Sequence, residues 1–246
     1  MKIIAPSNLK IRFILFISLF SIVGIIMGGN IIFNMFSSVD VSVKNNKYKT
    51  VIIDAGHGGP DGGTSADDGT VEKDINLQIA HKLNEFLVSV GVETVMIRTE
   101  DISVHDDTAN TIREKKVSDI KNRLSILNNT DNAIFVSIHQ NHFSQSQYSG
   151  TQVFYSKNNP DSRNLADRIR HSVITVLQPE NSREIKQSGS DIYLLHHAEN
   201  PAVMVECGFL SNPEETEKLK NENYQRKLAL LIALGIMDFI NKTEAV

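Results

Sequence analysis

The chain contains the stretch Val51-Ile-Ile-Asp-Ala-Gly-His-Gly-Gly-Pro-Asp-Gly-Gly63, which decides its fold. An apolar run typical of a buried strand ends at Asp54, and His57 follows at once in a loop crowded with glycine. Glycines allow positive φ and sharp turns, and they leave open space around a neighbouring side chain. A glycine-rich turn with an incidental histidine is the simpler alternative. A histidine that only filled a core would not need such a loop, so we expect a strand that delivers His57 to an open site.

Two later segments have the same build, an apolar run that ends in a polar side chain. Residues 133–139 read Ala-Ile-Phe-Val-Ser-Ile-His, and residues 201–206 read Pro-Ala-Val-Met-Val-Glu. Ligands of open α/β sheets bind in the crevice beyond the carboxyl ends of the strands. We therefore expect His139 and Glu206 to meet His57 in one crevice.

These side chains supply a ligand set for a metal ion. Glu72 is a fourth candidate, because it lies where a loop passes into a helix. Two histidines and a carboxylate, with an open fourth position, are a usual ligand set of catalytic zinc. The remaining carboxylate, Glu206, is then free to act as a general base.

In these motifs the chain resembles the zinc-dependent N-acetylmuramoyl-L-alanine amidases of the family often called amidase type 3. That family reads Asp-x-Gly-His-Gly-Gly, then a Glu that opens a helix, then Ser-(Ile/Leu)-His-x-Asn, then Val-Glu-x-Gly-Phe-(Leu/Ile)-Ser-Asn. All four blocks occur here in that order, at residues 54–59, 72–77, 137–141 and 205–212. The resemblance covers residues 49–241.

By position, the resemblance implies that His57, Glu72 and His139 bind one zinc ion per chain and that Glu206 is the catalytic residue. The implied reaction is hydrolysis of the amide between the lactyl group of N-acetylmuramic acid and the L-alanine of the stem peptide in peptidoglycan. Zinc lowers the pKa of water towards about 7 and polarises a carbonyl group. Glu206 would take a proton from the water and later give one to the departing amine.

Three neighbours of these motifs need an interpretation of their own. Asn141 and His142 are candidates for substrate contact, and His142 stands where the family commonly has a small residue. We favour His139 over His142 as the ligand because His139 directly follows the apolar strand. Cys207 is the only cysteine, so an intrachain disulfide is impossible. A zinc thiolate is the alternative role, but strand alternation points Cys207 away from the face of Glu206 and favours a buried, inert thiol.

The N-terminal part of the chain is separate from this pattern. Residues 13–39 carry no charge, and three basic residues precede them. A membrane span needs about 20 mainly apolar residues, and preceding basic residues favour a cytoplasmic N-terminus. We expect a signal anchor over residues 1–40, a linker over 41–49 and a catalytic domain over 50–246, with a cleaved signal peptide as the alternative. Either interpretation places the catalytic domain outside the cytoplasm, where peptidoglycan lies.

Length and composition fit a single catalytic domain. The chain has 246 residues and a net charge of −4, and its charges are interspersed, so no basic stripe indicates a nucleic-acid partner. Apolar runs alternate with helical patterns, which predicts an α/β fold with a mixed or mostly parallel sheet flanked by helices. In detail we expect a helix over residues 118–128, a loop over 178–190 and a short strand over 191–195.

The biological setting rests on a narrower resemblance. Gly-Gly-Pro-Asp-Gly-Gly followed shortly by Glu-Lys-Asp, on a short anchored chain without binding repeats, is similar to the spore-cortex amidases of endospore formers. Such enzymes remove stem peptides so that muramic-δ-lactam can form for germination. The resemblance implies a place between the forespore membranes, a deacetylase that acts on the same substrate, and an accessory exported protein. A vegetative autolysin with the same chemistry and a non-catalytic wall-binding or regulatory domain are the alternatives, although degenerate domains usually lose a residue that this chain keeps.

Overall fold

The computed structural model describes residues 46–243, all of which belong to a compact unit that spans residues 43–246. The signal anchor or signal peptide expected over residues 1–40 lies outside the described residues. Within residues 46–243, none of the helices combines the length and the apolar character that a membrane span requires.

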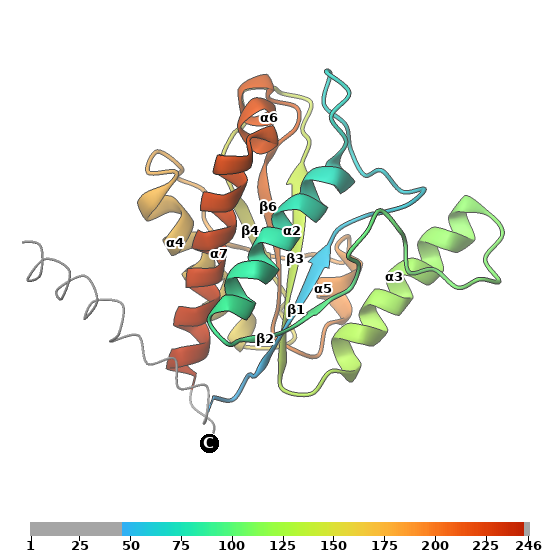
Figure 1. Cartoon of the computed structure of the whole chain (residues 1–246), viewed down its shortest axis with the longest axis horizontal. Coiled ribbons are helices and arrows are strands. Elements are labelled where there is room, and N and C mark those ends of the chain that lie inside the picture. The colour runs from blue at the N-terminus through green and yellow to red at the C-terminus, as the bar shows by residue number, and fades with distance from the viewer. Residues whose placement is uncertain (1–45, 244–246) are drawn as a thin grey trace, which may run out of the picture. The chain divides into compact units, whose positions relative to one another are not determined.

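A six-stranded sheet forms the centre of the domain (Figure 1). Its strands are β1 (Thr50–Ala55), β2 (Glu93–Met96), β3 (Ala133–Asn141), β4 (Gln152–Tyr155), β5 (Lys186–Gln187) and β6 (Ala202–Phe209). They lie in the order β2-β1-β3-β6-β4-β5, and only the β4–β6 pair is antiparallel among the described strands. The expected α/β fold with a mixed sheet is therefore confirmed.

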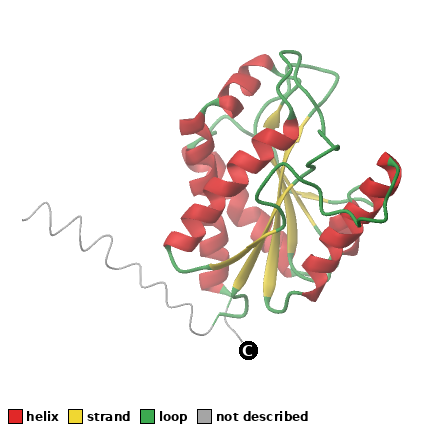
Figure 2. Cartoon of the chain, turned by 45° about the vertical axis from the view of Figure 1, so that its right-hand side comes forward, coloured by secondary structure: helices red, strands yellow, loops and turns green. Residues whose placement is uncertain are grey.

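Helices cover both faces of this sheet, as Figure 2 shows. They are α2 (Glu72–Ser89), α3 (Ile112–Asn129), α4 (Asp161–Val176), α5 (Tyr193–His197), α6 (Pro213–Lys220) and α7 (Glu222–Lys242). One apolar cluster packs α2, α4 and α7 against one face, and we call it the α2–α4–α7 core. A smaller cluster packs α3 and α5 against the other face, and we call it the α3–α5 core.

Alternation along the central strands sends successive side chains into these two cores. In β6, Val203 and Val205 enter the α2–α4–α7 core, whereas Met204 enters the α3–α5 core. Strands buried on both faces read as continuous apolar runs. Burial on both faces therefore explains why the three strands that lead to His57, His139 and Glu206 read as nearly continuous apolar runs.

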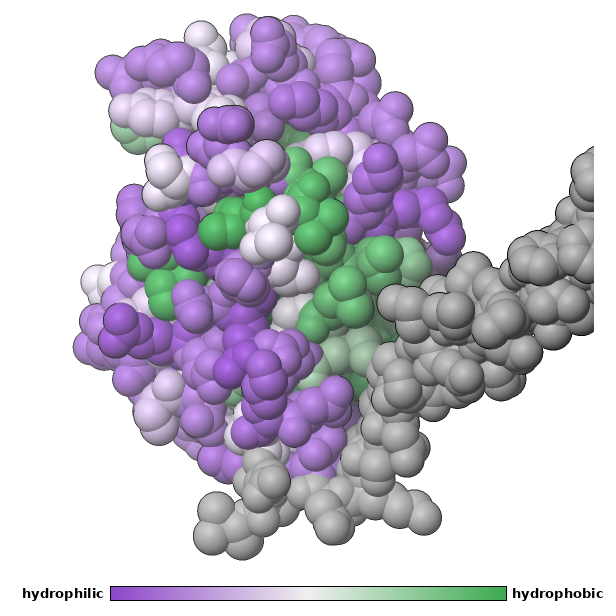
Figure 3. Space-filling view, turned by 90° about the vertical axis from the view of Figure 1, so that its left-hand side faces the viewer, coloured by the Kyte–Doolittle hydropathy of each residue, from purple (hydrophilic) through white to green (hydrophobic). Residues whose placement is uncertain are grey.

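The helices that form the larger core bury one face and leave the other in solvent. Hydrophilic side chains cover most of the side of the molecule seen in Figure 3, with apolar groups between them. Among the large apolar side chains of α4 and α7, the exposed ones are Val176, Leu230 and Leu234. This distribution is the one expected of amphipathic helices packed on a sheet.

Three local predictions differ from the structure. The strand expected over residues 191–195 is wrong: this segment leads into α5, because the adjacent Leu194 and Leu195 both pack into the α3–α5 core. The loop expected over residues 178–190 contains the short edge strand β5. Helix α3 begins earlier than expected because Thr111 and Glu114 form a reciprocal capping box that starts the helix there.

Candidate metal and catalytic site

The carboxyl ends of three parallel strands bring the expected site residues together. His57 follows the end of β1, and His139 lies near the end of β3. Glu206 of β6 is the direct Cα partner of His139, so their side chains leave the sheet on the same face. A ligand atom from each of His57, Glu72 and His139 lies within 4.8 Å of the others, and we call these three residues the metal cluster.

Glu72 holds the centre of the metal cluster. It begins helix α2 and is 3% exposed. Its Oε1 lies 2.9 Å from His139 Nδ1 and 3.4 Å from His57 Nε2. The backbone amides of Gln140 and Thr64 donate to its two carboxylate oxygens. Burial alone would raise the pKa of Glu72, but the two histidines hold that pKa well below its usual value.

His57 is held by its backbone as well as by its ring. Its φ of 62° lies in the left-handed region, which is uncommon for a residue with a side chain and costs free energy. The ring Nδ1 is 3.0 Å from Asp61 Oδ2, and Lys116 holds the other oxygen of that carboxylate. Burial alone would lower the pKa of His57, but the hydrogen bonds to Asp61 and Glu72 raise it to about 9.

Two glycines make room for the metal cluster. A Cβ atom at Gly56 would stand 2.2 Å from Nε2 of His139. A Cβ atom at Gly63, whose φ is +72°, would stand 2.5 Å from Oε2 of Glu72. Neither position can carry a side chain without displacing a member of the cluster, which explains the glycines around His57 in the sequence.

The chemistry of these residues fits a zinc ion. Two imidazoles and one carboxylate match the donor set of catalytic zinc sites. The cluster also stabilises positive charge, because Glu72 favours its ionised form while the pKa of His57 is raised. A cation among these three side chains would take the place of the proton that the histidines otherwise share with Glu72.

Glu206 lies beside the metal cluster without a structural partner of its own. Its Oε2 is buried and accepts no hydrogen bond from the described residues. Burial raises the pKa of Glu206 to about 7, against the opposing charge of His139. A carboxylate with a pKa near neutrality, free of hydrogen bonds and next to a metal-binding cluster, is suited to exchange protons with a substrate.

Two buried arginines fix the loop that carries His57, and sequence reasoning missed both of them. Arg98 donates to the carbonyl oxygens of Ala55 (2.8 Å) and Gly56 (3.1 Å). Arg123 donates to the carbonyl oxygens of Ala55 (3.0 Å) and His57 (2.8 Å). These hydrogen bonds satisfy carbonyl groups that leave the sheet at the end of β1. No spacing in the sequence indicated them, because both arginines reach the loop from distant elements.

Arg123 is balanced by carboxylates beneath the site. It forms a buried ion pair with Asp54 and bonds Asp119 one helical turn away, at 2.7 Å. Ser137 donates to the second oxygen of Asp54 at 2.6 Å. Burial alone would raise the pKa of Asp54, but Arg123 and Ser137 hold it below its usual value. Asp54, the last residue of the first apolar run, therefore holds Arg123, and Arg123 in turn holds the loop that carries His57.

The remaining candidates lie outside the metal cluster. The side chain of His142 is exposed, and the cluster contains His139 instead. Asn141 lies next to a register shift between β3 and β6 and lines a pocket that extends towards β4. Cys207 is fully buried in the α2–α4–α7 core, on the face opposite Met204, and burial raises its thiol pKa. The expectation of a buried thiol that points away from Glu206 is confirmed.

The metal cluster opens on a pocket of about 280 Å³. Two residues of the metal cluster, His57 and His139, line it together with Asp61, Tyr193 of α5 and Met204 of β6. An α/β domain with a His–Glu–His cluster in a pocket, and with an unpartnered glutamate beside it, has the residues of a metal-dependent hydrolase.

Comparison with known proteins identifies the family to which this hydrolase belongs. Residues 51–238 match the family described as N-acetylmuramoyl-L-alanine amidase, and the chain belongs to that family. The match includes all four blocks of the sequence that carry the candidate site residues.

Several members of the family are similar to this chain over most of the described domain. The germination-specific N-acetylmuramoyl-L-alanine amidase of Bacillus subtilis (strain 168) is 29% identical over 198 residues, or 79% of this chain and 81% of that protein. The solved structure of the CwlD amidase of Clostridioides difficile, in complex with the GerS lipoprotein, is 43% identical with a TM-score of 0.75. That match covers 78% of this chain and 98% of CwlD. An N-acetylmuramoyl-L-alanine amidase of Clostridium difficile 630 is 31% identical with a TM-score of 0.68, over 80% of this chain and 98% of that one.

Proposed function

We propose that this enzyme hydrolyses the amide between N-acetylmuramic acid and L-alanine in peptidoglycan with one zinc ion held by His57, Glu72 and His139. The observation that carries the proposal is the register of β3 and β6, which sets Glu206 directly opposite His139. A metal-binding cluster and a carboxylate free to exchange protons thereby share one crevice. Membership of the amidase family supports the same substrate and bond.

The residues of the site have different roles in amide hydrolysis. A bound zinc ion supplies a Lewis acid that polarises the amide carbonyl and lowers the pKa of water towards about 7. Glu206 accepts the proton of the attacking water and returns it to the departing amine, which is a poor leaving group until it is protonated. Asp61 orients the imidazole of His57 through the 3.0 Å contact with Nδ1. Asn141 and His142 lie at the rim, where we place contacts with the substrate.

We assign the enzyme to the maturation of the spore cortex, where removal of stem peptides precedes formation of muramic-δ-lactam. The germination-specific amidase and CwlD, which are similar to this chain, support this setting. The complex of CwlD with a lipoprotein supports an accessory exported partner. We place the catalytic domain outside the cytoplasm, between the forespore membranes, held there by residues 1–40. A deacetylase would act on the same glycan after the stem peptide has left.

Mass spectrometry of purified peptidoglycan after digestion tests the reaction. The expected products are stem peptides with a free L-alanine amino terminus and glycan with a free lactyl carboxylate. Glu206→Gln is the matched control and should release almost none. A product with intact muramoyl-alanine amides, or products that form equally with the Glu206→Gln variant, would refute the assignment.

The biological setting needs a separate test. Deletion of the gene should remove muramic-δ-lactam from the cortex and leave vegetative wall composition unchanged. Expression throughout growth, together with unchanged cortex composition in the deletion strain, would instead identify a vegetative autolysin.

A further inference from the structure

A second pocket lies towards the β4–β5 edge of the sheet, and one of its lining residues, Gln152, is the strand neighbour of Glu206. Its volume is about 320 Å³, and we call it the edge pocket. It is lined by Asn141, Phe143, Tyr148, Gln152, Phe154, Arg183, Lys186 and Phe209. Nothing in the proposed mechanism uses Arg183 or Lys186.

Strand register connects the edge pocket to the catalytic site. Gln152 of β4 is the Cα partner of Glu206, and Lys186 of β5 is the Cα partner of Phe154. Directly paired residues point to the same face of a sheet, so these side chains share the face that carries Glu206. The register shift after His139 inserts one extra residue into β6, because Asn141 pairs with Phe209. This bulge turns Phe209 to the same face as Glu206, and the ring lines the edge pocket.

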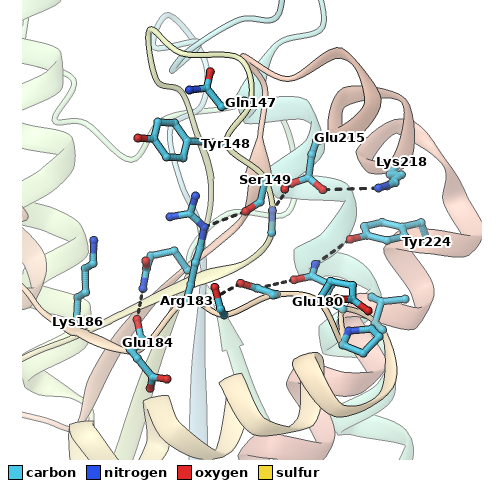
Figure 4. A pocket seen from close by; sticks show the side chains of 17 residues that line it. Gln147, Tyr148, Ser149, Glu180, Arg183, Glu184, Lys186, Glu215, Lys218 and Tyr224 are labelled. Atoms are coloured by element: carbon cyan, nitrogen blue, oxygen red, sulfur yellow. Dashed lines mark hydrogen bonds and ion pairs between the residues drawn. The ribbon is translucent and has the colours of Figure 1, made fainter.

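The charges of the edge pocket are both positive. Arg183 and Lys186 are its charged residues, and neither forms an ion pair with any of the described residues. The Arg183 guanidinium lies over the rings of Phe209 (4.6 Å) and Tyr148 (5.5 Å), and its Nε donates to the carbonyl oxygen of Ser149 at 2.9 Å. Figure 4 shows Arg183 below Tyr148 with its hydrogen bond to Ser149, and it shows Lys186 in the same pocket. The guanidinium of Arg183 is therefore held in place by its contacts, whereas the exposed side chain of Lys186 has no such contact among the described residues.

A larger pocket of about 710 Å³ continues from the edge pocket and shares Tyr148, Gln152, Arg183 and Lys186 with it (Figure 4). Three carboxylates also line this larger pocket: Arg170 engages that of Glu184 at 2.8 Å, the backbone amide of Gly150 donates to that of Glu215 at 2.8 Å, and Glu180 has no ion pair among the described residues. The two unpaired cations, Arg183 and Lys186, therefore lie in the part that the two pockets share.

The pocket on the other side of the metal cluster has the opposite character. Apart from the histidines of the metal cluster, its cations are committed, because Lys116 pairs with Asp61 and Arg123 pairs with Asp54 and Asp119. Asp191 also lines that pocket and has no ion pair within residues 46–243. Away from the metal cluster itself, an anionic ligand would therefore meet unpaired cations only on the edge-pocket side of the site, as far as the described residues show.

Resting on the proposed amidase function, we propose that the edge pocket binds the stem peptide, with its free carboxylates on Lys186 and Arg183. The two arms that leave the scissile amide differ in charge: the N-acetylated glycan is neutral, whereas the stem peptide carries carboxylates along its length and at its end. Charge complementarity therefore places the peptide arm over the β4–β5 edge and the glycan arm on the side of His57. Lys186 and Arg183 are specificity-determining residues in this arrangement, and neither takes part in proton transfer.

Charge reversal at Lys186 tests the proposal, because its side chain is exposed and makes no hydrogen bond to the described residues. Lys186→Glu in the full chain is compared with the control Lys227→Glu, an exposed lysine of α7 that lines neither pocket. Two substrates are used: an N-acetylmuramoyl tripeptide with free carboxylates, and the same compound with those carboxylates converted to amides. Steady-state kinetics are measured for each protein at low and at high salt.

We expect Lys186→Glu to lower kcat/KM for the acidic substrate by about three- to tenfold, mainly through KM, because exposed charge pairs contribute modestly. The effect should shrink at high salt and be absent with the amidated substrate and with Lys227→Glu. Equal losses on both substrates, or a Lys186→Glu protein that behaves like the control, would overturn the proposal while leaving the amidase function intact. A wild-type enzyme that cleaves neither substrate would overturn both.

Discussion

Replacing Glu206 with glutamine should separate the chemistry of this site from its metal binding and from its stability. The glutamine keeps the shape and one oxygen but removes the basic carboxylate. No described hydrogen bond to Oε2 is broken, because none is formed. General acid–base assistance is worth about 10²–10⁴-fold. We expect the loss of turnover to lie near the upper end, at about 5 kcal/mol of transition-state free energy, because one group serves as both base and acid.

The same substitution should change how the stability of the metal-free protein depends on pH. Burial raises the pKa of Glu206 from 4.5 to about 7. Between these values the folded protein keeps this proton while the unfolded chain releases it, so the contribution of Glu206 to stability falls as pH rises through the interval. The interval corresponds to about 3 kcal/mol. Glutamine carries no charge, so the variant should match the wild type below pH 4.5 and exceed it by up to about 3 kcal/mol above neutral pH.

Three measurements on residues 43–246 check these expectations. Elemental analysis gives the zinc content, release of stem peptide from peptidoglycan gives turnover, and urea unfolding with a chelator gives stability across the pH range. The difference between variant and wild type is used, because titrating groups that do not interact with Glu206, such as Asp54, affect both proteins alike. Turnover within about tenfold of wild type would remove Glu206 from its role. Low turnover with lost zinc would make it a ligand, and a difference in stability that stays flat with pH would refute the argument from burial.

The remaining predictions concern the metal, the backbone and the N-terminus. Alanine at any position of the metal cluster should abolish bound zinc and activity, and full zinc retention in His139→Ala would identify His142 or another residue as the ligand. Gly56→Ala should also lose zinc, since its Cβ would stand 2.2 Å from a ring nitrogen of His139; Gly91→Ala, which meets nothing within 4 Å but has a φ of +81°, should cost about 1 kcal/mol of stability and keep zinc. Deletion of residues 1–40 should leave a soluble, folded and active domain, and N-terminal sequencing of the native protein should begin at residue 1; a start near residue 29 would establish cleavage.

Sequence reasoning located the site residues that lie at the ends of strands or at the start of a helix. An apolar run buried on both faces must stop where the strand leaves the sheet, and parallel strands stop at the same edge. His139 and Glu206 could therefore be placed in one crevice before any contact was known, and their direct pairing agrees. Glu72 was a candidate because it lies where the glycine loop passes into a helix, and the resemblance to the amidase family implied its role as a ligand.

The sequence could not indicate what holds that crevice in shape. Arg98 and Arg123 reach the His57 loop from 42 and 66 residues away in the chain, and no local pattern marks an arginine whose partners are distant carbonyl groups. Helix α5 was misread as a strand because five residues are too few for periodicity to distinguish the two. Leu194 and Leu195 are compatible with a strand or with a helix in the sequence. In the structure both pack into the α3–α5 core, which requires the helix.

By itself, then, the sequence determined the α/β class, the strands that end in functional side chains, and the candidate residues of the metal cluster together with Glu206. These features are local, because a run of apolar residues, a glycine loop and a helix start each carry their own signal. Tertiary structure alone decided the bulge in β6, the buried arginines and the two cations of the edge pocket. Each of these depends on which strands become neighbours, and that choice follows from the free energy of packing the whole domain and leaves no mark at any one position in the chain.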